Sequence, residues 1–214
     1  MIVGLYMAKN VQVISPDASL SDAAQKMTRY QIRRLVVTDK DAIVGMVSRR
    51  DLMNASPTGL NPFSVIAVTE GISTRVRSFM KHPVLTVEPD RPIEQAARLM
   101  TEHHIGCLPV TRSRTLVGII TESDIFRAFT EVLTEHPDSV RITFDLTESE
   151  NVLSYLADAT GRHGLNLLSF ITFHEGNRRL AFAGVRGQKV QDFVTELWNS
   201  GHNVVSVLQA SPAS

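Results

Sequence analysis

The first 130 residues contain an internal repeat, and this repeat restricts the fold more than any other feature of the sequence. When the chain is shifted against itself by 73 positions, residues 3–53 align with residues 76–126 without a gap. About a third of the aligned positions are identical, far more than composition alone would produce. The identical pairs include Met7 and Met80, Pro16 and Pro89, Ala23 and Ala96, Val44 and Val117, Gly45 and Gly118, and Asp51 and Asp124. An ungapped match of this length predicts one shared plan for both copies, which can bury matching apolar faces about a pseudo-twofold axis.

Within each copy the hydrophobic pattern predicts the order β-α-β-β-α. In the first copy, residues 11–14 form an apolar stretch, and Ser19 is placed to cap the helix that follows. The apolar face of that helix consists of Leu20, Ala23, Ala24 and Met27. Residues 35–37 and 43–47 predict two strands joined by a polar turn, and a second helix begins at about Arg49. The second copy repeats these elements at residues 84–87, 92–103, 107–110, 116–121 and 122–133.

Composition and charge exclude several classes of protein. The chain has 22 basic and 22 acidic residues, so its formal net charge of zero gives no reason to expect binding to nucleic acid. The single cysteine, Cys107, excludes an internal disulfide and favours a reducing compartment, so we expect the cytoplasm. No targeting segment is visible, and no run approaches the roughly 18 apolar residues that span a bilayer, so we expect no membrane insertion.

The sequence also lacks the usual signs of catalysis and metal binding. No nucleophile elbow, Walker loop or Gly-x-Gly-x-x-Gly fingerprint is present, so we expect no catalytic residues and no enzymatic activity. His103 and His104 are adjacent on a predicted helix and point about 100° apart, without a spaced carboxylate or cysteine partner. We therefore expect no metal site and no covalent cofactor.

One motif occurs at the end of the third strand in both copies. Residues 45–51 and 118–124 share the form Gly, two apolar residues, Ser or Thr, two variable residues and Asp. In a structural interpretation, Ser48 or Thr121 caps the next helix, and the Asp three residues later complements the helix dipole. In a functional interpretation, the carboxylate accepts hydrogen bonds from a ribose diol, while the hydroxyl and the helix N-terminus face a phosphate. The sequence leaves both interpretations open.

Together with the strand before it, this motif resembles the signature of a tandem cystathionine-β-synthase-type (CBS) domain pair, or Bateman module. The preceding strands read Ile-Arg-Arg-Leu-Val-Val at residues 32–37 and Ile-Gly-Cys-Leu-Pro-Val at residues 105–110. The resemblance implies a non-catalytic regulatory module that binds adenosine-containing ligands in clefts between the repeats. It also implies a set of nucleotide-binding residues: Arg33, Arg34, Ser48, Arg50, Asp51, Gly106, Cys107, Thr121, Ser123 and Asp124.

The two implied sites differ in charge. Four arginines, Arg33, Arg34, Arg49 and Arg50, could surround phosphates at the first site, whereas residues 106, 107, 122 and 123 supply no cation at the second. We therefore expect a phosphorylated ligand at the first site. The alternative is that these arginines form a solvated face, and Val36 also stands where the second copy has Pro109.

The last third of the chain predicts a separate domain with the order β-α-β-β-α-β, which is ferredoxin-like. This topology, with the strand entry at residues 164–167, resembles an ACT domain, a fold used for amino-acid sensing and for side-by-side dimerisation. Asn151 lies nearest the position at which an amino acid would bind, where such ACT domains usually have a glycine. Because Glu148 and Glu150 would repel a carboxylate there, we favour dimerisation over amino-acid binding at Asn151.

The whole arrangement predicts an α+β protein with residues 1–55 as the first CBS repeat, 56–73 as a connector, 74–133 as the second CBS repeat and 138–209 as the ACT-like domain. Short matches at residues 1–3, 55–57 and 201–205 resemble the acetoin-utilisation B-type family of regulatory proteins. We expect a homodimer that senses AMP, ADP, ATP or a related adenosine ligand and regulates an unknown protein. The alternatives are a structural adaptor with unoccupied clefts and an amino-acid sensor.

Overall fold

The computed structural model describes residues 1–57, 61–64, 73–133, 139–148 and 151–209. The chain divides into two compact units, residues 1–128 and 129–214. The first unit contains both repeats, and the second contains the predicted C-terminal domain. Most of the predicted connector, at residues 58–60 and 65–72, and the junction before the ACT-like domain, at residues 134–138, lie outside the described residues. The exact domain limits stay predictions.

The first repeat has the predicted order of elements. It consists of β1 (Val13–Ile14), α2 (Leu20–Arg29), β2 (Arg34–Asp39), β3 (Ala42–Ser48) and α3 (Arg49–Ala55), with β2 in the middle of the sheet. β1 is parallel to β2, and β3 is antiparallel to it. Ser19 and Asp22 cap α2 reciprocally, and the four apolar positions predicted for its inner face are all buried. The predicted cap and core of this helix are therefore confirmed.

The second repeat follows the same plan with one exception. It consists of a 3-10 turn, η1 (Val76–Ser78), then α5 (Ile93–Glu102), β4 (Cys107–Arg112), β5 (Thr115–Thr121) and α6 (Glu122–Leu133). The strand predicted at residues 84–87 is wrong, because only Val87 makes an isolated bridge, to Val110. Pro109 stands next to that bridge and has no N–H with which to extend the ladder, whereas its counterpart in the first repeat is Val36, which pairs with β1.

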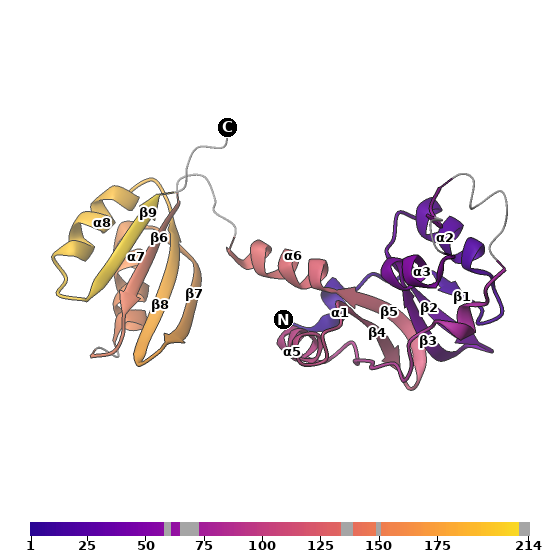
Figure 1. Ribbon diagram of the computed structural model, residues 1–214. Helices are drawn as coiled ribbons and strands as arrows, with labels where there is room; N and C mark the ends of the chain where they lie inside the picture. The colour runs from indigo at the N-terminus through magenta and orange to yellow at the C-terminus, as the bar shows by residue number, and fades with distance from the viewer. Residues whose placement is uncertain (58–60, 65–72, 134–138, 149–150, 210–214) are drawn as a thin grey trace. The chain divides into compact units, whose positions relative to one another are not determined.

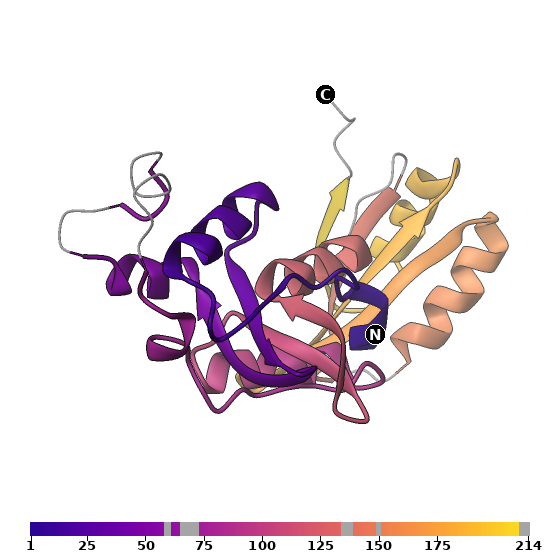
Figure 2. The same cartoon turned by 90° about the vertical axis from the view of Figure 1, so that its right-hand side faces the viewer.

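The two repeats exchange their leading segments. The helix α1 (Val3–Tyr6) begins the first repeat in sequence, but Val3 is buried in the core of the second repeat, where its N–H donates to the Arg91 carbonyl over 2.9 Å. Conversely, Val76, at the start of the second repeat, lies in the core of the first. In Figures 1 and 2 the N-terminal segment accordingly lies beside the elements of the second repeat. Each repeat therefore completes the other's core.

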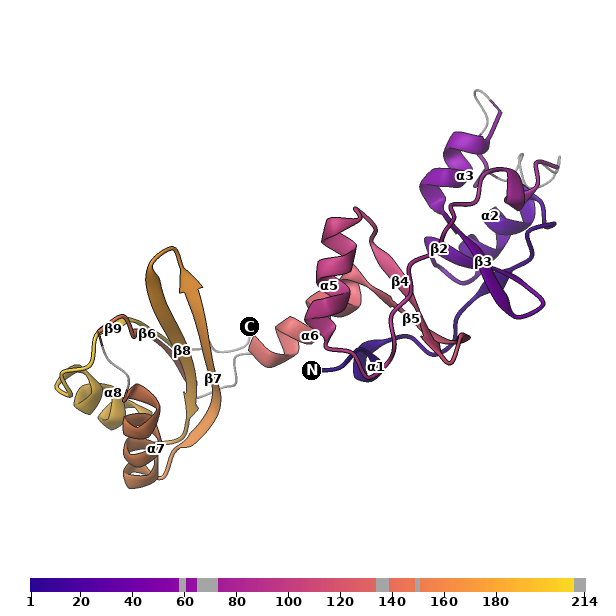
Figure 3. The same ribbon diagram turned by 90° about the horizontal axis from the view of Figure 1, so that it is seen from below.

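The C-terminal unit has the predicted β-α-β-β-α-β order. Its elements are β6 (Ser139–Asp145), α7 (Val152–His163), β7 (Asn166–Glu175), β8 (Arg178–Arg186), α8 (Val190–Trp198) and β9 (Val204–Gln209). The sheet order is β7-β8-β6-β9, and every neighbouring pair of strands is antiparallel. Both helices cover one face of this sheet, as Figure 3 shows, and their apolar sides meet the buried residues of β6 and β8 in one core. Among the described residues, no helix is long and apolar enough to cross a membrane.

Candidate functional site

Both repeated motifs form capping boxes where a strand passes into a helix. The Ser48 N–H and Oγ donate to Asp51 Oδ2 over 2.8 and 2.5 Å, and the Asp51 N–H donates back to Ser48 Oγ over 3.3 Å. Thr121 and Asp124 repeat this arrangement, with Thr121 N–H and Oγ1 at 2.9 and 2.7 Å from Asp124 Oδ2. The structural interpretation of the motif is thus confirmed in both repeats. It engages one carboxylate oxygen and leaves Oδ1 for another partner.

In each repeat, a cation contacts this second carboxylate oxygen. Lys81 Nζ lies 3.3 Å from Asp51 Oδ1, and Arg127 Nη2 lies 3.0 Å from Asp124 Oδ1. The Asp51 side chain is only 10% exposed, whereas that of Lys81 is 73% exposed. The two repeats therefore neutralise equivalent carboxylates with residues from different places: Lys81 follows η1, and Arg127 lies on α6.

Asp51 opens onto a cleft of about 720 Å³ in the first unit. Eight of the ten nucleotide-binding residues implied by the family resemblance line it: Arg33, Arg34, Ser48, Arg50, Asp51, Gly106, Cys107 and Ser123. Thr121 and Asp124 do not line it. The sequence assigned Gly106, Cys107 and Ser123 to a second site, whereas in the structure they line the same cleft as Asp51. Because the repeats face each other, the start of β4 and the end of β3 contribute to the same walls.

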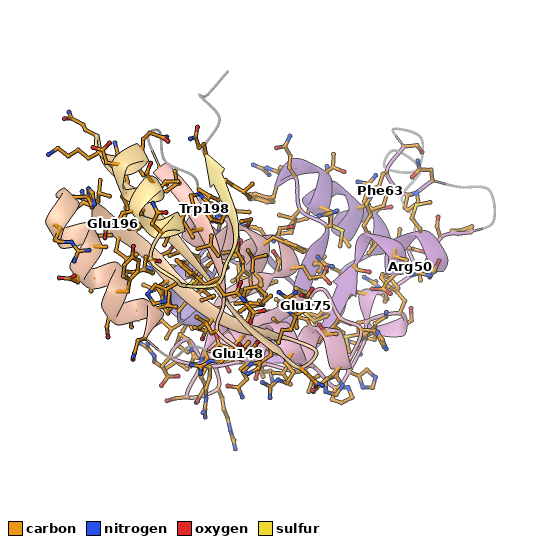
Figure 4. The ribbon with its side chains drawn as sticks, turned by 90° about the vertical axis from the view of Figure 1, so that its left-hand side faces the viewer. Arg50, Phe63, Glu148, Glu175, Glu196 and Trp198 are labelled. Atoms are coloured by element: carbon orange, nitrogen blue, oxygen red, sulfur yellow. The ribbon has the colours of Figure 1, made fainter. Side chains whose placement is uncertain are left out.

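The charged side chains in the cleft are mainly basic. The basic residues are Arg33, Arg34, Arg49, Arg50 and Lys81, and the acidic residues are Asp51 and Glu122. Arg49 is already engaged, since its guanidinium carbon lies 3.9 Å from the centre of the Phe63 ring. Arg50, which Figure 4 labels together with Phe63, is exposed in the first turn of α3. This excess of positive charge favours an anionic ligand.

Gly106 lies where side chains of both repeats meet. A Cβ atom at this position would lie 2.6 Å from Glu122 Oε2 and would also collide with the Arg34 guanidinium. Arg34 thus reaches the second repeat's part of the cleft, where the sequence led us to expect no cation. The absence of a side chain at residue 106 makes room for this pair of opposite charges.

Cys107 lies beside the same pair and is 8% exposed. Burial raises the pKa of its thiol to about 11, although the nearby Arg34 charge acts in the opposite direction. A thiol with this pKa is protonated at neutral pH, and a protonated thiol is a poor nucleophile.

Sequence reasoning missed part of the cleft. Lys81, Pro83, Val84 and Leu85 line it, although they precede the second repeat's first helix and belong to no motif. His104, Ile105 and Glu122 also line it. One available signal was the repeat alignment itself, which places Lys81 opposite Ala8 and so marks an added charge near the motif.

The C-terminal unit gives less support for its predicted residue. Asn151 is exposed at the N-cap of α7, and its side chain makes no capping hydrogen bond. Two of its predicted neighbours, Ser149 and Glu150, lie outside the described residues. An amino-acid site at Asn151 therefore stays a prediction. Among the described residues, no group of three or more His, Cys, Asp or Glu side chains is placed to hold a metal ion.

Comparison with known proteins identifies the first unit. The CBS domain family model matches residues 3–58 and 76–131. A CBS domain-containing protein of Dictyostelium discoideum is 31% identical over 140 residues, which cover 64% of this chain and 97% of that protein. A crystal structure from Vibrio cholerae, described as a candidate acetoin utilization protein (AcuB), is 30% identical with a TM-score of 0.52, covering 62% of this chain and 93% of that one.

A protein of Methanocaldococcus jannaschii, named as a candidate archaeal homologue of γ-AMPK, is also 30% identical, with a TM-score of 0.51. The match covers 60% of this chain and 47% of that protein, so the chain spans about half of this relative's length. All of these matches agree with the repeat and with the fold of residues 1–128. The chain therefore belongs to the CBS domain family, with two CBS domains in tandem.

Proposed function

We propose that this protein is a regulatory sensor that binds an adenosine-containing ligand, such as AMP, ADP or ATP, in the cleft beside Asp51. The observation that carries the proposal is a mostly buried carboxylate, oriented by its capping box, in a cleft with five basic side chains. The cleft volume of about 720 Å³ lies in the range typical of small-molecule sites. Proteins built on CBS pairs are regulatory, and one relative is named as a candidate homologue of γ-AMPK.

In this proposal each part of the ligand has its own group of residues. The ribose diol donates to Asp51 Oδ1, because Oδ2 is already engaged by Ser48. The phosphates meet Arg33 and Arg50, whose guanidinium groups suit anionic oxygens. The base packs against apolar side chains of the cleft such as Val84 and Ile105. Ligand binding then changes how the two repeats pack against each other, and this change alters the activity of a regulated partner. Such coupling requires the ligand to bind one of two conformations of the protein more tightly than the other.

Titration calorimetry of nucleotide-free protein with AMP, ADP, ATP, NAD and S-adenosylmethionine tests this function. We expect Asp51→Ala to weaken binding about tenfold or more, since hydrogen bonds to a charged group contribute about 1.5–3 kcal/mol. The matched control is Asp22→Ala, which removes the equivalent capping carboxylate of α2, a residue that does not line the cleft. It should cost about 0.3–1 kcal/mol of stability and leave the affinity unchanged.

Two results would contradict this proposal. Unchanged affinity in a folded Asp51→Ala variant would remove Asp51 from the site. The absence of binding and of thermal stabilisation with all five ligands would favour a structural adaptor, the main alternative.

Two further parts of the proposal concern the whole protein. We propose that the C-terminal unit joins two copies of the chain. The edge strand β9 supports this, because it exposes the apolar side chains of Val205 and Leu208.

We also propose a link to acetoin utilisation, which the likeness to the Vibrio cholerae protein supports. Growth of a deletion strain on acetoin tests this link.

A further inference from the structure

Lys81 occupies the carboxylate oxygen that the proposed function assigns to the ribose. Its Nζ lies 3.3 Å from Asp51 Oδ1, in a pair whose carboxylate is nearly buried and whose ammonium is largely exposed. The main chain of Lys81 is fixed, because its N–H donates to the Met46 carbonyl over 2.8 Å and its carbonyl accepts from the Met46 N–H over 3.0 Å. The Lys81 side chain can therefore change partners without any movement of the backbone.

The other repeat shows that the fold does not need a lysine at this place. Ala8 is the counterpart of Lys81 and makes the same two main-chain hydrogen bonds, with Ile119, both at 2.9 Å. The backbone pairing is therefore compatible with alanine. The ammonium of Lys81 is an addition to one repeat, next to the motif aspartate that lines the cleft.

We propose that Lys81 is a specificity-determining residue that makes the cleft select phosphorylated over unphosphorylated adenosine ligands. This inference rests on the proposed function and deepens it. A ribose diol that binds Asp51 Oδ1 must displace the ammonium. With an unphosphorylated ligand, the displaced ammonium finds no new anion and is only hydrated. The loss of its ion pair with Asp51 then lowers the affinity for the ligand. With a phosphorylated ligand the ammonium moves to a phosphate oxygen, and one charge-assisted contact replaces another.

The chemistry of the side chain suits this exchange. Lysine carries a compact charge on a flexible stem, so it can follow either anion, whereas arginine requires a more fixed geometry. Arg33 and Arg50 line the same cleft as Lys81. A phosphate bound in this cleft offers the ammonium a second anion, and its several oxygens can accept hydrogen bonds from more than one cation.

The test compares AMP with adenosine, and ADP with methylthioadenosine, on wild-type protein and on Lys81→Ala. We expect the variant to bind AMP and ADP several-fold more weakly and to bind the unphosphorylated ligands as well as or better than the wild type. The ratio of AMP to adenosine affinity should fall about tenfold, equivalent to 1.4 kcal/mol. A purely structural role would weaken all four ligands alike and leave that ratio unchanged.

Controls separate this inference from the function on which it rests. Lys9→Ala removes an exposed positive charge that does not line the cleft, and it should leave the ratio unchanged. Lys81→Gln keeps the length of the side chain without its charge and should behave like Lys81→Ala, which guards against a folding defect in one variant. If wild-type protein binds nucleotides and the ratio is unchanged in both Lys81 variants, this inference is wrong and the proposed function stands. If wild-type protein binds no adenosine ligand, both fail.

Discussion

At the scale of single residues, three positions of the cleft are defined by what their neighbours contact or exclude. Asp51 serves both as a helix cap and as the carboxylate that faces the cleft, because its two oxygens have different partners. At Gly106 the constraint is space and not backbone freedom, since its φ is not positive and a Cβ atom would press on the ends of the Arg34 and Glu122 side chains. Cys107 is protonated because burial disfavours its charged form.

Cys107 gives a prediction at this scale. With a pKa of about 11, its thiolate fraction at pH 8 is small, and the thiolate is the nucleophile. We expect iodoacetamide to alkylate the native protein about 100-fold more slowly than the urea-unfolded chain at pH 8. The native rate should rise as the pH approaches 11. Mass spectrometry reports this residue directly, because the chain has a single cysteine. Equal rates in the native and unfolded states would contradict the assignment.

At the scale of elements, the exchange of leading segments makes the two repeats interdependent. The segment around α1 packs against β5, and Gly118 on β5 leaves room for the Met7 side chain. Gly45 on β3 leaves the same room for Met80. In each repeat, the glycine of the motif therefore makes room for a methionine from the leading segment that packs against that repeat.

This exchange predicts that α1 stabilises the second repeat. Val3 is fully buried in that core, whereas the adjacent Ile2 is 42% exposed. We expect Val3→Ala to lower the free energy of unfolding by about 1–3 kcal/mol, through lost burial and the cavity left behind. Ile2→Ala is the matched control and should cost much less. Urea unfolding followed by circular dichroism measures both, and equal small effects would contradict the packing of Val3.

At the scale of the whole molecule, the first unit contributes a basic cleft and the second a sheet with open edges. The strand order β7-β8-β6-β9 leaves β7 and β9 at the edges of the C-terminal sheet. Edge strands present unpaired main-chain groups and are ready to pair with another chain. Leu208 on β9 is 54% exposed, which adds an apolar contact to such pairing.

The proposed assembly is tested on the full chain by sedimentation. We expect a dimer at micromolar concentration, and Leu208→Glu should shift it toward monomer by placing two like charges close together. Phe126→Glu is the matched control: this residue is also an exposed apolar side chain, but it lies on α6. A monomeric wild type would contradict the assembly. If Phe126→Glu dissociates the dimer and Leu208→Glu does not, the interface lies on the CBS pair and not on the C-terminal sheet.

The sequence by itself determined the local structure. The repeat, the capping residues Ser19, Ser48 and Thr121, and the β-α-β-β-α-β order of the last third follow from periodicity and short-range hydrogen bonding, which act within a few residues. The family also followed from the repeated motif and is confirmed. Six of the ten predicted site residues lie in the two repeated motifs, and the other four lie at the start of the strand before each motif. Eight of the ten line the cleft.

Only the tertiary structure decided which residues share the cleft. The exchange of α1 between repeats, the meeting of Arg34 with Glu122 at Gly106, and the pairing of Lys81 with Asp51 join residues that are far apart in the chain. No periodicity encodes such contacts, because they depend on how two apolar faces pack against each other. The missing strand at residues 84–87 has the same kind of cause, since its ladder depends on the N–H that Pro109 lacks.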